Sequence, residues 1–244
     1  MNSSRPDATA LVSPEWLAAH IDDPDTCLIE IAGLGQDDMQ AYRAVHVPGA
    51  VGWKWKDMLW DPAMREFPSP DAFAARLAES GIGNDTAVVF YGEDIQFGLY
   101  AWWAFRYCGH SNVRVLDGGR YRWRAEGRPL TTDVPVARAP ATYAPVARRE
   151  DMRVHRDEVL AALGDADTLI LDGRSPEEYA GTRVGGPGGP DVGAVRYGRI
   201  PGARHLHYVD LLDADKRFKS AAEIRALPAL RDLDLKRLDR KSVV

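Results

Sequence analysis

The chain has 244 residues, of which 45% are hydrophobic and 27% are charged, and its formal net charge is −5. This composition is typical of a globular protein with a buried core, and the acidic balance argues against general attraction to nucleic acid or anionic lipid. No apolar run approaches the ~20 residues that span a bilayer, and the N-terminal segment lacks the apolar core of a signal peptide. We therefore expect a cytoplasmic protein that binds neither membranes nor nucleic acid.

The first half of the chain alternates predicted helices with apolar strands. In chain order these elements are a helix opening at 13–18, a strand at 26–31, a Pro-Gly turn at 46–50, a helix after Ser69, a strand at 86–91, a loop at 92–98, a helix at 99–107 and a strand at 113–116. The strands are β-branched or aromatic runs, which are typical of parallel strands buried on both faces. The alternation predicts a parallel sheet covered by helices.

The second half repeats part of this order. His46–Ala50 (HVPGA) resembles Arg199–Ala203 (RIPGA), and each turn follows a predicted strand. The helix openings at 13–18 and 155–160, the strands at 26–31 and 168–172, and the segments at 67–73 and 218–224 also correspond. Four matches in the same order indicate a duplicated unit. After Ala226 the second copy continues without an apolar strand or a Gly-rich loop, so it lacks the counterpart of residues 86–116.

These observations predict an α/β protein of two tandem units with parallel central sheets flanked by helices, the second unit being incomplete. The predicted boundaries are a first domain at 1–133, a linker rich in Pro, Ala and Thr at 134–150, a partial second domain at 151–226 and a charged tail at 227–244. A parallel sheet without its central strand exposes apolar edges, so we expect a protein partner to cover the second domain.

Several segments of the two units resemble the rhodanese superfamily, specifically its tandem two-domain sulfurtransferases. They are HVPGA at 46–50, Gly-Ile-Gly at 81–83, Leu-Asp-Gly-Gly at 116–119 followed by Trp123, LDGRSPEEY at 171–179 and GRIPGA at 198–203. The resemblance covers residues 11–133 and 151–226. It implies transfer of sulfane sulfur from thiosulfate or 3-mercaptopyruvate to cyanide or a thiol, through a persulfide on one cysteine.

Such chemistry needs a cysteine thiolate in a loop between a strand and a helix N-terminus. In the first copy, Gly92 stands where that cysteine would follow the strand, and Glu93 and Asp94 come next, so we expect an inactive loop that repels an anionic donor. The second copy has no such loop. No catalytic residue is therefore assigned, and the chain as given is expected to be inactive or severely impaired.

Two cysteines and two arginines are the remaining candidates for functional roles. Cys27 lies in a predicted strand and Cys108 at a helix end before Gly109, and both are expected to be buried structural residues. The resemblance implies that Arg174 helps to bind the anionic donor, for which a forked guanidinium is suited, and Arg183 is a second substrate-binding candidate. The alternative for Arg174 is a structural salt bridge with Glu177 or Glu178.

Metal and cofactor sites are not predicted. His205 and His207 are two positions apart, and His46 is distant in sequence, so no metal-ligand spacing is present. The glycine-rich run at 185–190 lacks the ending of a phosphate-binding loop and favours a flexible excursion. A cysteine-type phosphatase would need a Cys-x5-Arg loop, which the sequence does not contain.

Two functions remain open. The first is a sulfurtransferase that takes a small anionic sulfur donor and a cyanide or thiol acceptor, with its cysteine loop absent from this chain and its C-terminal domain truncated. The second is a non-catalytic rhodanese-like module that binds anions or a protein partner, which the acidic first loop and the missing nucleophile favour.

Overall fold

The computed structural model describes residues 10–32, 39–61, 63, 66–185 and 195–233. The chain divides into two compact units, Met1–Arg149 and Glu150–Val244. Each unit has its own parallel sheet, and each is described separately below.

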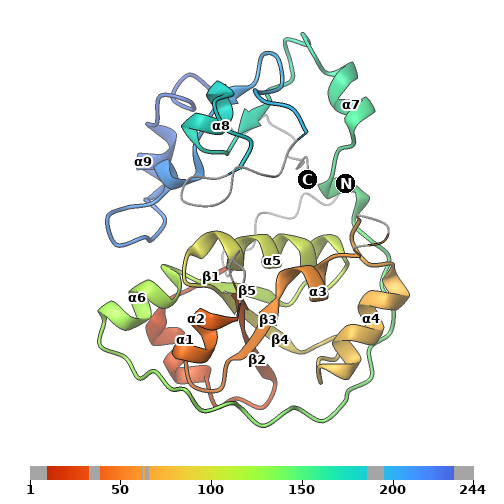
Figure 1. Ribbon diagram of the computed structural model, residues 1–244, viewed down its shortest axis with the longest axis vertical. Coiled ribbons are helices and arrows are strands. Elements are labelled where there is room, and N and C mark those ends of the chain that lie inside the picture. Colours follow the sequence, from red (N-terminus) through yellow and green to blue (C-terminus); the bar gives the residue numbers. More distant parts are fainter. Residues whose placement is uncertain (1–9, 33–38, 62, 64–65, 186–194, 234–244) are drawn as a thin grey trace. The chain divides into compact units, whose positions relative to one another are not determined.

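The described part of the first unit contains one parallel sheet with the strand order β1-β5-β4-β2-β3. The strands are β1 (Leu11–Val12), β2 (Thr26–Ala32), β3 (Val51–Lys54), β4 (Ala87–Tyr91) and β5 (Val113–Leu116). The helices are α1 (Pro14–His20), α2 (Gln40–Ala44), α3 (Trp55–Leu59), α4 (Pro70–Glu79), α5 (Ile95–Tyr107) and α6 (Gly119–Ala125). Figure 1 shows this sheet beneath α5 and among the shorter helices. The predicted parallel sheet flanked by helices is confirmed.

Alternate side chains of the strands point to two apolar layers. On one face Leu28 and Val89 join Leu17 of α1 and Trp123 of α6 in a buried cluster. On the other face Phe90 meets Phe105 of α5 at a ring-centroid distance of 4.7 Å. Every residue of β2 is buried, as expected for a parallel strand covered on both faces. The core of the unit therefore lies along β2 and β4. The carboxyl end of β4 leads into the loop predicted at 92–98, of which residues 95–98 instead form the first turn of α5.

Helix starts follow the capping signals of the sequence. Ser13 and Ser69 accept hydrogen bonds from the backbone N–H groups of Trp16 and Ala72, each at 3.2 Å, and Pro occupies the first turn of both helices. At the end of α5, Gly109 adopts a φ of +96°, a conformation that glycine allows and that terminates a helix.

The segment predicted as a linker, 134–150, packs along the first unit through residue 149. Arg138 donates to the carbonyl oxygens of Gly81 at 3.2 Å, Thr26 at 3.1 Å and Pro24 at 2.8 Å. Tyr143 is buried, and its hydroxyl lies 3.1 Å from Nδ1 of His110. These contacts give the segment fixed positions without any regular secondary structure, and Figure 1 shows it as a green trace along the unit.

The second unit has short elements in its described residues. They are η1 (Glu150–Met152), α7 (Arg156–Ala161), β6 (Leu171–Asp172), α8 (Pro176–Ala180), β7 (Arg204–His205), η2 (Tyr208–Leu211) and α9 (Ala221–Arg225). The strand expected at 168–172 is limited to its last two residues. Among the residues that the structure describes, β6 pairs only with β7, in parallel. In the first unit β2 is paired on both sides, with β3 and β4.

The two units share the same local geometry around the Pro-Gly-Ala turns. In the first unit Ile29 pairs with Val51, directly after the turn, and in the second Leu171 pairs with Arg204. Both turn glycines have a φ of +77°, and one tyrosine hydroxyl braces each turn. Tyr42 donates to the carbonyl oxygen of Ala50, and Tyr179 donates to that of Ala203, each at 2.8 Å.

Candidate functional site

The loop after β4 is closely packed at the position where a nucleophile was considered. α5 begins at Ile95, with Asp94 as its N-cap. A Cβ atom placed on Gly92 would lie 2.9 Å from the carbonyl oxygen of Asp94 and 3.2 Å from that of Ile31. Backbone atoms cannot yield to such a contact as a flexible side chain can. The loop therefore has no room for a cysteine side chain at residue 92.

A buried ion pair lies at the carboxyl end of β2, next to this loop. Nη1 of Arg120 is 3.0 Å from Oε1 of Glu30, and both side chains are 2% exposed. Nη2 of Arg120 is 3.2 Å from Oε2 of Glu93, whose side chain is 56% exposed. Arg120 also donates to the carbonyl oxygens of Ala41 at 2.9 Å and of Val45. This arginine thus ties α6, α2, β2 and the loop together.

The electrostatics of this cluster follow from burial. Burial raises the pKa of the Glu30 carboxyl, although the Arg120 charge opposes that shift. The pKa of the Tyr91 hydroxyl lies well above its usual range, because the group is buried and close to Glu30. The guanidinium is already engaged by two carboxylates and two carbonyls, so the arrangement suits a structural role better than anion binding.

Sequence reasoning missed this cluster. The pattern at 26–31 predicts a strand that contains Glu30, and no local pattern indicates a role for Arg120. The signal was an acidic residue within an otherwise apolar strand, at Cys27–Ile31, because a buried carboxylate requires a partner.

Both cysteines are buried, as expected. Cys27 lies in β2 and is 4% exposed, and burial raises the pKa of its thiol to about 11. Cys108 caps the C-terminal end of α5 and is 3% exposed. A persulfide cysteine must be ionised and accessible. Neither thiol has the exposure of a sulfur-transfer nucleophile.

In the second unit, Arg174 is held by Asp172 and not by the partners considered from the sequence. Nη2 of Arg174 lies 2.6 Å from Oδ2 of Asp172, and Nε lies 3.0 Å from Oδ1. The Arg174 side chain is 37% exposed and that of Asp172 is 10% exposed. Hydrogen bonding to Arg174 lowers the pKa of the Asp172 carboxyl. Glu178 instead forms the capping box of α8 with Ser175. The salt bridge that was the alternative role of Arg174 is therefore formed with Asp172 rather than with Glu177 or Glu178.

Arg183 and the histidines occupy separate surroundings. Nε of Arg183 donates to the carbonyl oxygen of Gly185 at 3.2 Å, within the chain segment that follows α8. Both ring nitrogens of His46 lie near carbonyl oxygens of the first unit, whereas Nε2 of His205 donates to that of Arg174 at 2.9 Å. Among the described residues, no group of three or more His, Cys, Asp or Glu side chains could hold a metal ion. The glycine-rich run at 185–190 lies outside the described residues from 186 onward.

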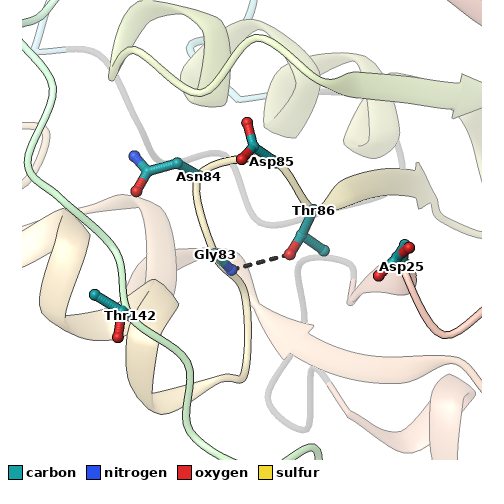
Figure 2. A pocket seen from close by; sticks show the side chains of 6 residues that line it. All are labelled: Asp25, Gly83, Asn84, Asp85, Thr86 and Thr142. Atoms are coloured by element: carbon teal, nitrogen blue, oxygen red, sulfur yellow. Dashed lines mark hydrogen bonds between the residues drawn. The ribbon is translucent and has the colours of Figure 1, made fainter.

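A polar pocket of about 400 Å³ lies at the opposite, amino-terminal ends of β2 and β4 (Figure 2). Its lining residues are Asp25, Gly83, Asn84, Asp85, Thr86 and Thr142. The N–H of Gly83 donates to Oγ1 of Thr86 at 2.9 Å, which shapes the turn before β4. Two carboxylates and no basic side chain line the pocket, so it is not suited to an anionic sulfur donor. Sequence reasoning did not predict it.

Comparison with known proteins identifies the family. A rhodanese-like domain model matches residues 13–126. Sulfur carrier protein TtuD of Thermus thermophilus is 40% identical over 221 residues, which cover 89% of this chain and 76% of that protein. The chain belongs to the rhodanese family. The resemblance read from the sequence motifs is therefore confirmed.

Further relatives agree with this assignment. The putative thiosulfate sulfurtransferase SseA of Mycobacterium tuberculosis is 41% identical over 220 residues, covering 89% of this chain and 71% of that protein. The crystal structure of Escherichia coli SseA, described as a 3-mercaptopyruvate sulfotransferase, matches with a TM-score of 0.73 and 28% identity, over 89% of this chain and 82% of that one. In the part of this rhodanese-family chain that the structure describes, no helix is both long and apolar enough to cross a membrane.

Proposed function

We propose that this protein acts in sulfane-sulfur transfer from thiosulfate or 3-mercaptopyruvate to cyanide or a thiol. With thiosulfate and cyanide, a cysteine thiolate takes the outer sulfur, the S–S bond of thiosulfate breaks and sulfite leaves. Cyanide then attacks the persulfide, and thiocyanate and the thiolate form. The names of the relatives support this class of reaction. The observation that carries it in this chain is the partly exposed guanidinium of Arg174, fixed at the end of β6.

The 244 residues supply the scaffold and the donor-binding arginine of this reaction, but no suitable nucleophile. Cys27 and Cys108 are buried, and the pKa of Cys27 is raised to about 11. The chain as given is therefore proposed to be inactive. The test is thiocyanate production from thiosulfate and cyanide by the chain and by its C27S/C108S variant. We expect no difference between them, and turnover that disappears in the variant would overturn the proposal.

Donor binding can be tested without turnover. Thiosulfate titrated into the chain in a calorimeter should bind, and R174A should abolish binding. R217A is the matched control, because Arg217 is also paired with an aspartate, Asp213, and its side chain is 42% exposed. R183A tests whether Arg183 assists, and a partial loss of affinity is expected. Equal affinity of R174A and the native chain would remove Arg174 from the proposed site.

We also propose that residues 151–226 form a partial second rhodanese-like domain, joined to the first domain (1–133) by the segment 134–150, with 227–244 as a tail. The common register of β2–β3 and β6–β7 supports this organisation, as do the two tyrosine-braced turns. Limited proteolysis is the test. Two protected fragments are expected, and cleavage within 151–226 as fast as within the tail would contradict the proposal.

The alternative is a non-catalytic module that binds anions or a protein partner. Two observations favour it. The loop after β4 carries Glu93 beside a guanidinium that is already neutralised, and Leu171 of β6 is 40% exposed whereas its counterpart Ile29 is fully buried. A partner that covers the β6 edge should protect the Leu171 amide from hydrogen exchange. Cysteine-dependent turnover would exclude this alternative.

A further inference from the structure

Asp172 accepts two hydrogen bonds from one edge of the Arg174 guanidinium. Oδ1 of Asp172 accepts from Nε at 3.0 Å, and Oδ2 accepts from Nη2 at 2.6 Å. This is the fork-to-fork geometry that arginine forms with carboxylates. Oδ1 also accepts from the backbone N–H of Arg174 at 3.1 Å, so the carboxylate fixes both the main chain and the side chain of the arginine.

The second hydrogen of Nη2 has a partner as well. The carbonyl oxygen of Gly198, in the segment just before the second Pro-Gly-Ala turn, accepts from Nη2 at 2.9 Å. A guanidinium has five N–H donors, and Nε and Nη2 together account for three of them. Nη1 donates to none of the residues that the structure describes, and the side chain is 37% exposed. The two remaining donors are therefore available on one nitrogen only.

The backbone beneath the arginine is also fixed. Nε2 of His205, on β7, donates to the carbonyl oxygen of Arg174 at 2.9 Å, and the His205 ring stacks on Tyr179 at a centroid distance of 4.4 Å. Asp172 and His205 are paired residues of β6 and β7. The arginine thus projects from a braced strand end, and its orientation is set before any ligand arrives.

We infer that Asp172 is a positioning residue that takes the Nε–Nη2 edge of Arg174 and leaves Nη1 as the atom that meets the anionic group of the sulfur donor. This inference rests on the proposed function, in which Arg174 binds the donor. It corrects the expectation that a forked guanidinium would receive the anion, because the fork is occupied. An anion at Nη1 is bound by the charge of the guanidinium and by the N–H groups of a single nitrogen. A carboxylate therefore cannot use two parallel N–H donors on neighbouring nitrogens, and it gains no advantage over a sulfonate-type group.

Nitrogen-detected NMR of the arginine side chains tests the inference on the full chain, with thiosulfate as the probe. In the native chain, thiosulfate should shift the Nη1 resonance of Arg174 and leave its Nε–H resonance in place. In D172N the side chain keeps one acceptor oxygen but loses the charge and the second acceptor. The hold on the shared edge is weakened, so thiosulfate should also shift the Nε–H resonance. Its dissociation constant should fall about fivefold, because a nearby negative charge no longer opposes the anion. A merely structural role of Asp172 predicts weaker binding in D172N instead.

D213N is the matched control, because it removes the same charge from another aspartate–arginine pair of the same unit. Its thiosulfate affinity should equal that of the native chain. If R174A abolishes binding but D172N binds no more tightly and its Nε–H resonance stays fixed, the positioning role is wrong while the proposed donor site stands. If R174A binds thiosulfate as the native chain does, both fail.

Discussion

The carboxylates Glu30 and Asp172 stand at the same place in the two units, yet they take arginines from different parts of the chain. Glu30 pairs in register with Gly52 on β3, and Asp172 pairs in register with His205 on β7. The position two residues after Glu30 holds Ala32, whereas the position two residues after Asp172 holds Arg174. In the first unit Arg120, from α6, fills the role of the missing arginine.

The difference in origin leads to a difference in use. Arg120 approaches from inside the fold, so its ion pair is 2% exposed on each side and braces the core. Arg174 comes from the strand end itself and stays 37% exposed. A buried ion pair is costly to break, but ligands cannot reach it. A partly exposed pair contributes little to stability, and its charged groups remain accessible to ligands. One acidic position thus serves as a structural brace in one unit and as a positioning group in the other.

The largest expected effect is the loss of the buried pair. R120A leaves the Glu30 carboxylate without its partner and should lower the free energy of unfolding by about 3–5 kcal/mol, whereas R174A should cost at most about 1 kcal/mol. All seven tryptophans lie in the first unit, so urea unfolding followed by tryptophan fluorescence reports that unit. Circular dichroism and hydrogen exchange follow the second unit. Similar losses of unfolding free energy in R120A and R174A would show that the two ion pairs do not differ in their contribution to stability.

The next effect concerns the tight loop beside the buried pair. G92A places a Cβ 2.9 Å from a backbone oxygen and should destabilise the chain by about 1–3 kcal/mol. Gly173, beside Arg174, is the matched control, because the nearest atom to its Cβ would be the carbonyl oxygen of Leu206 at 3.8 Å. G173A should stay within about 0.5 kcal/mol of the native chain. Thermal unfolding measures both, and a neutral G92A would mean that the loop can relax.

The two tyrosine braces give a smaller contrast. Y42F leaves the carbonyl oxygen of the fully buried Ala50 without its hydroxyl donor and should cost about 1–2 kcal/mol. Y179F removes the same bond to Ala203, but Tyr179 is only half-buried, so water can replace the hydroxyl and about 0.5 kcal/mol is expected. Hydrogen exchange of the turn amides in each unit measures the two effects. A larger loss of amide protection in Y179F than in Y42F would show that the tyrosine hydrogen bond stabilises the turn of the second unit more.

The smallest effect is the pH dependence, in which the two carboxylates should act with opposite sign. Burial raises the pKa of Glu30 above its ordinary 4.5, so its ionisation opposes folding, and native stability falls as pH rises from 4.5 through the folded-state pKa. Arg174 lowers the pKa of Asp172 below its ordinary 3.8, so its contribution is present above pH 3.8 and is lost as pH falls through the folded-state pKa.

Stability measured from pH 3 to 7 in E30Q and D172N separates these contributions. E30Q should lose the fall in stability above pH 4.5, and the difference between D172N and the native chain should shrink as pH falls below 3.8. The Asp172 contribution is expected to be at most about 1 kcal/mol, because the pair is partly exposed to solvent. A pH dependence of the same sign for both residues would contradict the comparison.

Local patterns in the sequence determined much of this protein. Apolar runs alternating with capped helices predicted the parallel sheet of the first unit, and the repeated Pro-Gly-Ala segments predicted two corresponding turns. Cys27 and Cys108 were expected to be buried, and the order of the motifs identified the rhodanese family. These features depend on residues close in sequence, whose spacing sets backbone conformation and burial.

The tertiary structure decided which charged groups meet. Arg120 and Glu30 form an ion pair although they are 90 positions apart in the sequence (120 − 30), and no local spacing rule predicts a contact at that separation. Arg138 holds residues 134–149 against the first unit by donating to backbone carbonyl oxygens. Because every residue has such a carbonyl, the sequence gives no sign of these contacts, and the composition of the segment predicted a free linker. Even the local choice of Asp172 over Glu178 depended on side-chain direction, because the helix N-terminus had already engaged Glu178. Which polar groups pair depends on which of them the fold brings close together, and the sequence alone shows only which groups are able to pair.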